Sequence, residues 1–270
     1  MEIHPLESPP ARPGPLAGAG IVVTRPVRQA AGLVRRLAAL GATPLVWPAI
    51  VILPPTDTAP LARVQRDLAT YDIAVFVSAN AVEYGVGDPA QWPATLAIAA
   101  PGPGTAEALA AVGLTRVHVP VDSYDSEGLL ALPELRDVAG RRVIIFRGDG
   151  GRELLGDTLR ERGARVDYVA CYRRAAPQSG AEGLLAALRD GRVDAVTLTS
   201  SEGLDNLLAA LGADGRARLL QVPTFVPHAR IAEHAKALGL RAVITTPGSD
   251  AGLIAGLLEW AAGRPITTRS

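Results

Sequence analysis

One set of landmarks occurs twice along this chain of 270 residues. An arginine ends an apolar run at Arg25 and again at Arg147, 122 positions later, and the glycines that close the next helical pattern, Gly41 and Gly163, are also 122 positions apart. Further pairs keep nearly this interval: Ser78 with Thr199, Gly113 with Gly239, and Gly128 with Gly252. Such a constant interval predicts an internal duplication, in which one module is present in two copies.

Within each copy, short β-rich runs alternate with helical patterns. In the first copy, Ile21–Val23 precedes leucines at helical spacing, and in the second, Val143–Phe146 precedes a helix expected over Glu153–Arg162. This alternation predicts an α/β fold of two similar domains, each a parallel sheet flanked by helices. Other strands are expected at Thr43–Ile52, Ile73–Val77, Ala97–Ala100, Val117–Val119, Val166–Tyr172, Ala195–Leu198, Thr224–Val226 and Ala242–Thr245.

Charge and cysteine content restrict the setting of the protein. Lys and Arg number 27 and Asp and Glu also number 27, so nothing indicates a nucleic-acid partner. The single cysteine, Cys171, excludes an internal disulfide and fits a reducing compartment. No apolar run reaches the roughly 18 residues that span a bilayer. Residues 1–19 are rich in Pro and Gly and lack a signal-peptide pattern. We therefore expect a cytoplasmic monomer with a flexible leader over residues 1–19 and a short tail over 265–270.

The residues expected at the carboxyl ends of the strands are mostly small or hydroxylated, and nearly all begin a helix. Ligands of open α/β sheets bind beyond these strand ends, and helix N-termini bind anions through free N–H groups. Ordinary helix caps would use the same residue types, so a purely structural role is the alternative. Together the loops favour a ligand with several carboxylates or phosphates in a cleft between two domains. The residues are Thr24, Arg25, Ser78, Ala79, Asn80, Gly104, Thr105, Arg147, Gly148, Gly150, Gly151, Thr199, Ser200 and Ser201.

Several other chemistries lack their motifs. Gly148 and Gly150 begin a dinucleotide fingerprint, but its third glycine position holds Glu153. There is no phosphate-binding loop ending in Gly-Lys-Ser/Thr and no Gly-x-Ser-x-Gly nucleophile elbow. The four histidines do not show metal-ligand spacing. We therefore expect no cofactor and no metal.

The segment RGDGGRELLGDTLRERGARVDYVACYRR, residues 147–174, resembles the signature region of the uroporphyrinogen-III synthase family of bacterial type. In that family an RGxGGRExLxxxL stretch runs into a strand that ends in Cys-Tyr-x-Arg. The stretches at Val23–Pro26, Gly102–Leu109, Thr199–Leu204 and Val226–Gly239 occur at the expected places. The resemblance covers residues 20–262, and the order and spacing of the motifs carry it.

The resemblance implies a particular domain arrangement. Residues 20–50 and 175–264 would form a discontinuous first domain, with residues 51–174 inserted as the second. Two extended strands, near Trp47–Ile52 and Tyr172–Ala176, would join the two domains. The repeat alone would equally allow two sequential domains.

The resemblance also implies a reaction. Members of the family convert hydroxymethylbilane, a linear tetrapyrrole with eight carboxylates, into uroporphyrinogen III. Ring D is inverted and water is lost, so the enzyme is a lyase that needs no cofactor.

Roles for individual residues follow from the family motifs. Tyr172 would donate a proton to the departing hydroxide, because a phenol is still protonated at neutral pH. The alternative is a tyrosine that only packs its ring beneath the cleft. Arg25 and Arg147 would bind carboxylates, or else pair with neighbouring acidic residues. Where relatives have a threonine this chain has Ile231, and His228 or Arg230 would make the carboxylate contact instead.

Two rival functions remain open at this stage. The same fold could serve as a non-catalytic two-domain ligand sensor, although no secretion signal or appended DNA-binding segment supports one. A nucleotide-sugar transferase also uses twin α/β domains, but the acidic metal motif of such enzymes is missing here.

Overall fold

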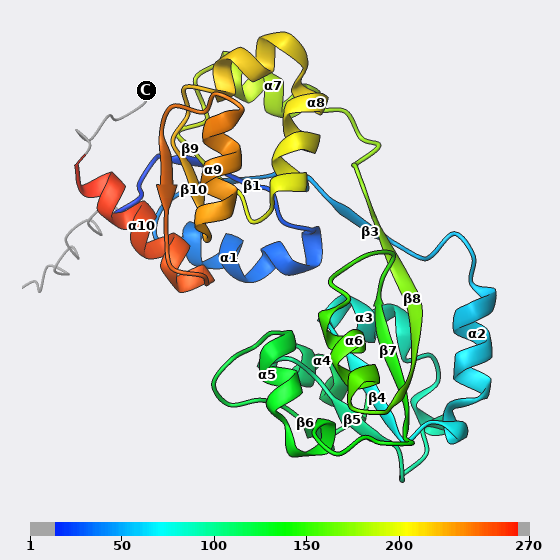
Figure 1. Ribbon diagram of the computed structural model, residues 1–270. Helices are drawn as coiled ribbons and strands as arrows, with labels where there is room; N and C mark the ends of the chain where they lie inside the picture. Colours follow the sequence, from blue (N-terminus) through cyan, green and yellow to red (C-terminus); the bar gives the residue numbers. More distant parts are fainter. Residues whose placement is uncertain (1–13, 264–270) are drawn as a thin grey trace, which may run out of the picture. The chain divides into compact units, whose positions relative to one another are not determined.

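The computed structural model describes residues 14–263 (Figure 1). The predicted tail and most of the predicted leader lie outside the described residues. The chain forms two compact units: Ile52–Ala175 is one, and the other combines the residues up to Val51 with those from Ala176 onward. The chain therefore passes between units at two points, each within a stretch expected to act as a linker.

The discontinuous unit, which we call unit 1, contains a five-stranded parallel sheet in the order β11-β10-β9-β1-β2. All four residues of β1 are buried, because helices cover both faces of the sheet. Ile21 and Val23 pack in the core with helices α1 and α10, whereas Val22 packs in the core with α7, α8 and α9. The strands are β1 (Gly20–Val23), β2 (Thr43–Val46), β9 (Ala195–Thr197), β10 (Thr224–Val226) and β11 (Val243–Thr245). The helices are α1 (Val27–Ala39), α7 (Glu182–Arg189), α8 (Ser201–Leu219), α9 (Ala229–Ala237) and α10 (Asp250–Ala262).

The continuous unit, unit 2, contains a six-stranded sheet in the order β3-β8-β7-β4-β5-β6, in which β4 to β8 pair in parallel. Ala74 and Phe76 of β4 face a core with α2, α3 and α4, and Ile73 and Val75 face one with α5 and α6. The strands are β3 (Val51–Leu53), β4 (Ile73–Phe76), β5 (Ala97–Ala99), β6 (Val117–His118), β7 (Arg142–Gly148) and β8 (Arg165–Ala175). The helices are α2 (Ala59–Arg66), α3 (Ala79–Gly85), α4 (Pro103–Ala111), α5 (Ser126–Ala131) and α6 (Leu154–Glu161).

The two sheets share one strand order. When β1 is matched with β7 and β2 with β8, the order β2-β1-β9-β10-β11 of one sheet corresponds, strand by strand, to the order β8-β7-β4-β5-β6 of the other. Glycines matched in the sequence also adopt matched conformations: φ is 90° at Gly41 and 88° at Gly163, and 95° at Gly113 and 97° at Gly239. Only glycine adopts such angles at little cost, so each helix end needs one. The parallel sheets flanked by helices are thus confirmed, while a duplication as their origin stays a prediction.

Three local features differ from the expectations. The strand expected over Thr43–Ile52 is two strands, β2 and β3, because Pro48 lacks an N–H and the chain leaves one sheet there for the other. Helix α7 has no counterpart among the predicted elements. The leader was expected to reach residue 19, yet Leu16 is only 1% exposed and its N–H donates to the Leu40 carbonyl, so residues 14–19 belong to the folded unit.

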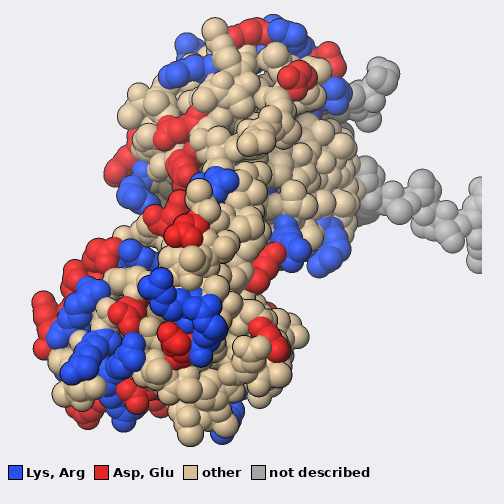
Figure 2. All heavy atoms as spheres, turned by 90° about the vertical axis from the view of Figure 1, so that its right-hand side faces the viewer, with Lys and Arg blue, Asp and Glu red and all other residues tan. Residues whose placement is uncertain are grey.

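Charged residues of both signs lie next to one another over the unit drawn lower in Figure 2. Within residues 14–263, no helix is long and apolar enough to cross a membrane.

Candidate active site

Tyr172 is packed inside unit 2. It lies in β8, is 2% exposed, and its ring covers Gly148, where a methyl group would lie 2.9 Å from a ring carbon. A β-bulge after Arg147 sets Gly148 opposite Tyr172 and so creates this contact. The ring is thus packed as in the alternative of a tyrosine that packs its ring beneath the cleft. Its hydroxyl nevertheless reaches the strand-end residue Ser78, with 3.2 Å between the two oxygens.

Ser78 connects Tyr172 to the start of a helix. Its hydroxyl caps α3 by accepting the Ala81 N–H at 3.1 Å. The next two residues, Ala79 and Asn80, form the first turn of α3, with Ala79 exposed and Asn80 half-buried. The Ser78 hydroxyl thus connects the Tyr172 phenol to the N-terminal end of α3. The positive partial charge at this helix end favours anions.

Helix α4 follows β5, and β5 is the neighbour of β4 in the sheet. Gly104, in the first turn of α4, is exposed, and a methyl group there would meet no atom within 4 Å, so the backbone at this turn is accessible. Thr105 behaves differently from the expectation, because it is buried. Its burial follows from its position on the inner side of α4, and Leu109 one turn later is buried on the same side.

The glycine loop after β7 holds an arginine at its start. The Arg147 guanidinium lies 3.9 Å from the centroid of the Tyr168 ring, and its Nη1 lies 2.8 Å from Oε1 of Glu153. This cation holds the pKa of the Glu153 carboxyl below its usual value. The alternative of pairing with a neighbouring acid thus applies to Arg147. Gly150 and Gly151 are exposed, and φ of 150° at Gly151 is a conformation that side chains disfavour.

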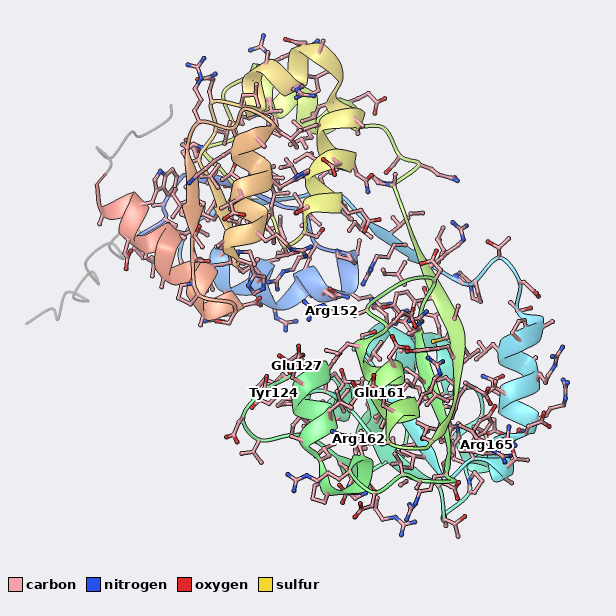
Figure 3. The ribbon with its side chains drawn as sticks, in the orientation of Figure 1. Tyr124, Glu127, Arg152, Glu161, Arg162 and Arg165 are labelled. Atoms are coloured by element: carbon pink, nitrogen blue, oxygen red, sulfur yellow. The ribbon has the colours of Figure 1, made fainter. Side chains whose placement is uncertain are left out.

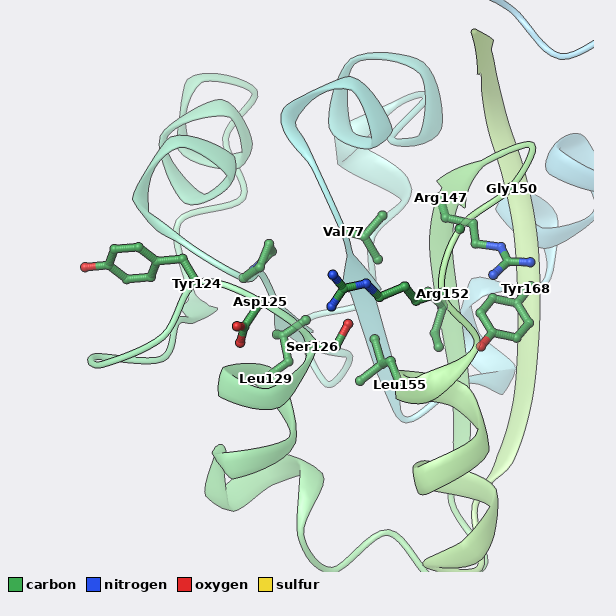
Figure 4. Close-up of a pocket in the computed structure, with 13 residues that line it drawn as sticks. Val77, Tyr124, Asp125, Ser126, Leu129, Arg147, Gly150, Arg152, Leu155 and Tyr168 are labelled. Atoms are coloured by element: carbon green, nitrogen blue, oxygen red, sulfur yellow. The ribbon is translucent and has the colours of Figure 1, made fainter. Parts of the chain in front are cut away.

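A cavity of about 280 Å³ opens beside this loop (Figure 4). It lies at the carboxyl ends of β4, β5 and β7, and three of the predicted residues, Arg147, Gly150 and Gly151, line it. Its other polar lining residues were not among the predicted ones. The signal available for Arg152 was its position directly after Gly150-Gly151. The remaining lining residues are Val77, Pro101, Tyr124, Asp125, Ser126, Leu129, Ile145, Arg152, Leu155 and Tyr168.

In unit 1 the predicted residues after β1 are already engaged in the structure. Thr24 is buried, and its hydroxyl donates to the Thr197 carbonyl at 2.8 Å, which ties β1 to β9. Arg25 forms an ion pair with Asp250 at the start of α10. For Arg25, too, the alternative of pairing with an acidic residue applies. A bound carboxylate would have to share this arginine with Asp250.

The loops after β9 and β10 present the other predicted residues of unit 1. Ser200 caps α8 by accepting the Gly203 N–H at 3.0 Å, and Thr199 and Ser201 lie half-buried on either side of it. His228 is the N-cap residue of α9 without a side-chain cap bond, and Arg230 is exposed in the first turn. Ile231, at the position where the resemblance led us to expect a threonine, is buried and belongs to the core.

The structure therefore gathers the candidate residues into two sets, one in each unit. Because β9 lies between β1 and β10, Arg25, Ser200 and His228 follow neighbouring strands of one sheet. In the other sheet Tyr172, Ser78 and Gly148 come together, whereas the Arg147 side chain contacts Tyr168 and Glu153. Among the described residues, no group of three or more His, Cys, Asp and Glu side chains is placed to hold a metal ion.

Parallel sheets with hydroxyls, glycines and arginines at their carboxyl ends define a two-unit α/β protein suited to an anionic small molecule. Residues 31–254 match the model of a protein family described as uroporphyrinogen-III synthase HemD. Because this match covers most of the sequence, the chain belongs to the uroporphyrinogen-III synthase family.

Individual relatives agree with this assignment. The uroporphyrinogen-III synthase of Salmonella typhimurium is 35% identical over 236 residues, which cover 85% of this chain and 96% of the relative. The Escherichia coli enzyme is 36% identical over the same extent. Among solved structures, a mutant uroporphyrinogen III synthase from Thermus thermophilus has a TM-score of 0.57 at 22% identity, covering 90% of this chain and 98% of that one. At that identity the likeness concerns the fold alone.

Proposed function

We propose that this chain converts hydroxymethylbilane to uroporphyrinogen III, with ring D inverted and one water lost. As a member of its family it is an enzyme of tetrapyrrole biosynthesis and a lyase. The observation that carries the proposal is the family match over residues 31–254. The Tyr172 phenol beside Ser78, at a strand end where such a substrate would bind, adds support from the geometry.

The strand-end residues of both units would hold the carboxylates of the substrate. The protein has no net charge, so backbone N–H groups at helix starts have to supply much of the binding. The starts of α3, α4 and α8 suit this role, and Arg25 and Arg147 add charge-assisted hydrogen bonds. At the start of α9, His228 and the exposed Arg230 would take the place of the missing threonine.

Tyr172 would act as the proton donor. Loss of hydroxide from the substrate gives an electrophilic azafulvene, and a donor within hydrogen-bond reach lowers the barrier to that loss. The substituted carbon of ring D then attacks to form a spiro intermediate, whose bond from that carbon to the ring C methylene breaks. The free carbon of ring D closes the macrocycle, and the proton that it loses returns to the Tyr172 phenolate. The Ser78 hydroxyl, 3.2 Å from the phenol oxygen, would orient the proton. The rest of the catalysis would be conformational, because the intermediate cyclises unaided to the uninverted isomer unless it is folded correctly.

We also infer a cytoplasmic monomer that acts on a small molecule without a cofactor and without a nucleic-acid partner. The single cysteine, the balanced charge and the family membership support this setting.

Isomer analysis tests the proposed function directly. The purified protein is incubated with freshly generated hydroxymethylbilane, and the oxidised porphyrin products are separated into type I and type III. We expect type III to dominate, while heat-inactivated protein gives type I. Exclusive formation of type I by the native protein would contradict the proposal and favour the non-catalytic sensor.

A further inference from the structure

The cavity beside the glycine loop combines an apolar floor with a polar rim. Val77, Leu129, Ile145 and Leu155 contribute apolar surface from the end of β4 and from α5, β7 and α6. At about 280 Å³ it is slightly smaller than most small-molecule sites, which typically measure about 300–1,000 Å³. A whole tetrapyrrole does not fit into such a volume, whereas one substituted ring does.

The rim carries a cation that its neighbours neutralise only weakly. In Figure 4 the Arg152 side chain extends from the loop before α6 across the cavity, toward Asp125 and Ser126. Its side chain is 74% exposed, and the ion pair with Glu127 is long, at 4.0 Å. An exposed pair at this distance contributes little, so an incoming carboxylate competes easily with Glu127.

The other charged groups at the cavity are more firmly engaged. Arg147 stacks on Tyr168 and pairs with Glu153 at 2.8 Å. The Asp125 carboxylate caps α5 by accepting the Gly128 N–H at 2.8 Å. That hydrogen bond, a second one from Ser123 and the charge of Arg152 lower the pKa of Asp125. Arg152 is thus the cation at this cavity that remains most available to a ligand.

We infer that this cavity binds one pyrrole ring of the substrate and that Arg152 binds a carboxylate side chain of that ring. The inference rests on the proposed function, because the substrate is a chain of four such rings with eight carboxylates. The ring lies on the apolar floor, and the carboxylate displaces Glu127 from Arg152. Arg152 is a specificity-determining residue in this arrangement, and the proton transfer at Tyr172 does not involve it.

The test compares three variants of the full chain. Arg152→Gln removes the charge, Arg152→Lys keeps it, and Arg165→Gln is the matched control. In Figure 3, Arg152, Glu127 and Tyr124 are on the side of unit 2 that carries the cavity, whereas Arg165 lies at the first residue of β8, away from them. Each variant is assayed for kcat and KM with hydroxymethylbilane. Binding of porphobilinogen, a monopyrrole with two carboxylates, is followed by NMR titration without turnover.

We expect Arg152→Gln to raise both the KM and the Kd for porphobilinogen by about tenfold, the usual effect of losing one charge-assisted hydrogen bond. The kcat should change little, Arg152→Lys should restore most of the affinity, and Arg165→Gln should match the wild type. Unchanged KM and porphobilinogen affinity in Arg152→Gln would overturn the inference. If the wild type forms only type I porphyrin while porphobilinogen binding still depends on Arg152, the proposed function fails and the cavity assignment stands.

Discussion

At the scale of single residues, Tyr172 and Gly148 depend on each other. The ring occupies the space that a side chain at position 148 would fill, so its position is fixed by packing and not by the hydrogen bond to Ser78 alone. Tyr84 adds a tilted aromatic contact, with 6.4 Å between ring centroids. A group held by packing on two sides keeps its hydroxyl in one place, which a proton donor requires.

Removing only the phenol oxygen should separate packing from chemistry. Tyr172→Phe keeps the ring, so we expect a folded protein that loses at most about 1 kcal/mol, while kcat falls by about 100-fold or more. Gly148→Ala should instead displace the ring and lower both kcat and the melting temperature, because overpacking costs about 1–3 kcal/mol. Measuring kcat and the melting temperature of both variants tests these expectations. Full turnover by Tyr172→Phe would remove Tyr172 from the mechanism.

Cys171, the neighbour of Tyr172, should be chemically inert. It is buried, its Sγ lies 3.1 Å from the Arg147 carbonyl oxygen, and burial raises its pKa to about 12. A thiol in the unfolded chain ionises near pH ~8.5, so above that pH the unfolded state gives up its proton first. We expect stability to be unaffected by this thiol at neutral pH and to fall as pH rises from about 9 toward 12.

A thiol reagent at mildly alkaline pH tests the same property. Cys171 should react only as fast as the protein unfolds, and within the mixing time in urea. Rapid modification of the native protein would mean that the site is open. Cys171→Ala should remove its share of the loss at alkaline pH.

At the scale of elements, hydroxyl and carboxylate side chains begin the helices of both units in the same way. Ser78, Ser200, Ser249 and Asp125 each accept the N–H of the residue three positions later. Capping therefore explains why these residue types occur there, which is the structural role expected as the alternative to anion binding. It does not oppose anion binding, because each cap occupies only one of the four free N–H groups at a helix start.

Position 200 can separate the two roles. Ser200→Ala should lower the free energy of unfolding by about 1 kcal/mol through loss of the cap. Ser200→Asp should preserve the cap, since aspartate caps as well as serine, yet place a negative charge where a substrate carboxylate is expected. We expect KM to rise several-fold more in Ser200→Asp than in Ser200→Ala. Equal KM values in the two variants would leave Ser200 with the structural role only.

The elements could largely be predicted from the sequence, but the state of the site could not. Apolar periodicity and helix-stop glycines such as Gly41 predicted most strands and helices, because these signals are local. The burial of Tyr172 follows from a bulge that forms only when β7 pairs with β8, and the engagement of Arg25 follows from Asp250, far away in the chain. Contacts of that kind depend on tertiary structure, so no local sequence pattern predicts them.

At the scale of the whole molecule, the two units differ in how the chain builds them. Unit 2 is one continuous segment with a hydrophobic core on each face of its sheet. We expect a fragment of residues 52–175 to fold alone, with cooperative thermal unfolding and dispersed amide NMR signals. It should still bind porphobilinogen through Arg152 but should not form uroporphyrinogen III. A fragment that shows neither cooperative unfolding nor dispersed signals would mean that unit 2 needs unit 1.

The discontinuity of unit 1 has a consequence for biosynthesis. As the nascent chain leaves the ribosome, β1 and β2 emerge before unit 2, yet the neighbour that β1 requires, β9, begins only at Ala195. The hydrogen bond from the Gly20 N–H to Asp194 spans 174 positions. Unit 2 can be complete while Ile21, Val22 and Val23 still have one unpaired edge. Chains that terminate before β9 would therefore contain a folded unit 2 together with an unpaired, aggregation-prone edge on β1. We expect quality-control proteases to remove such chains.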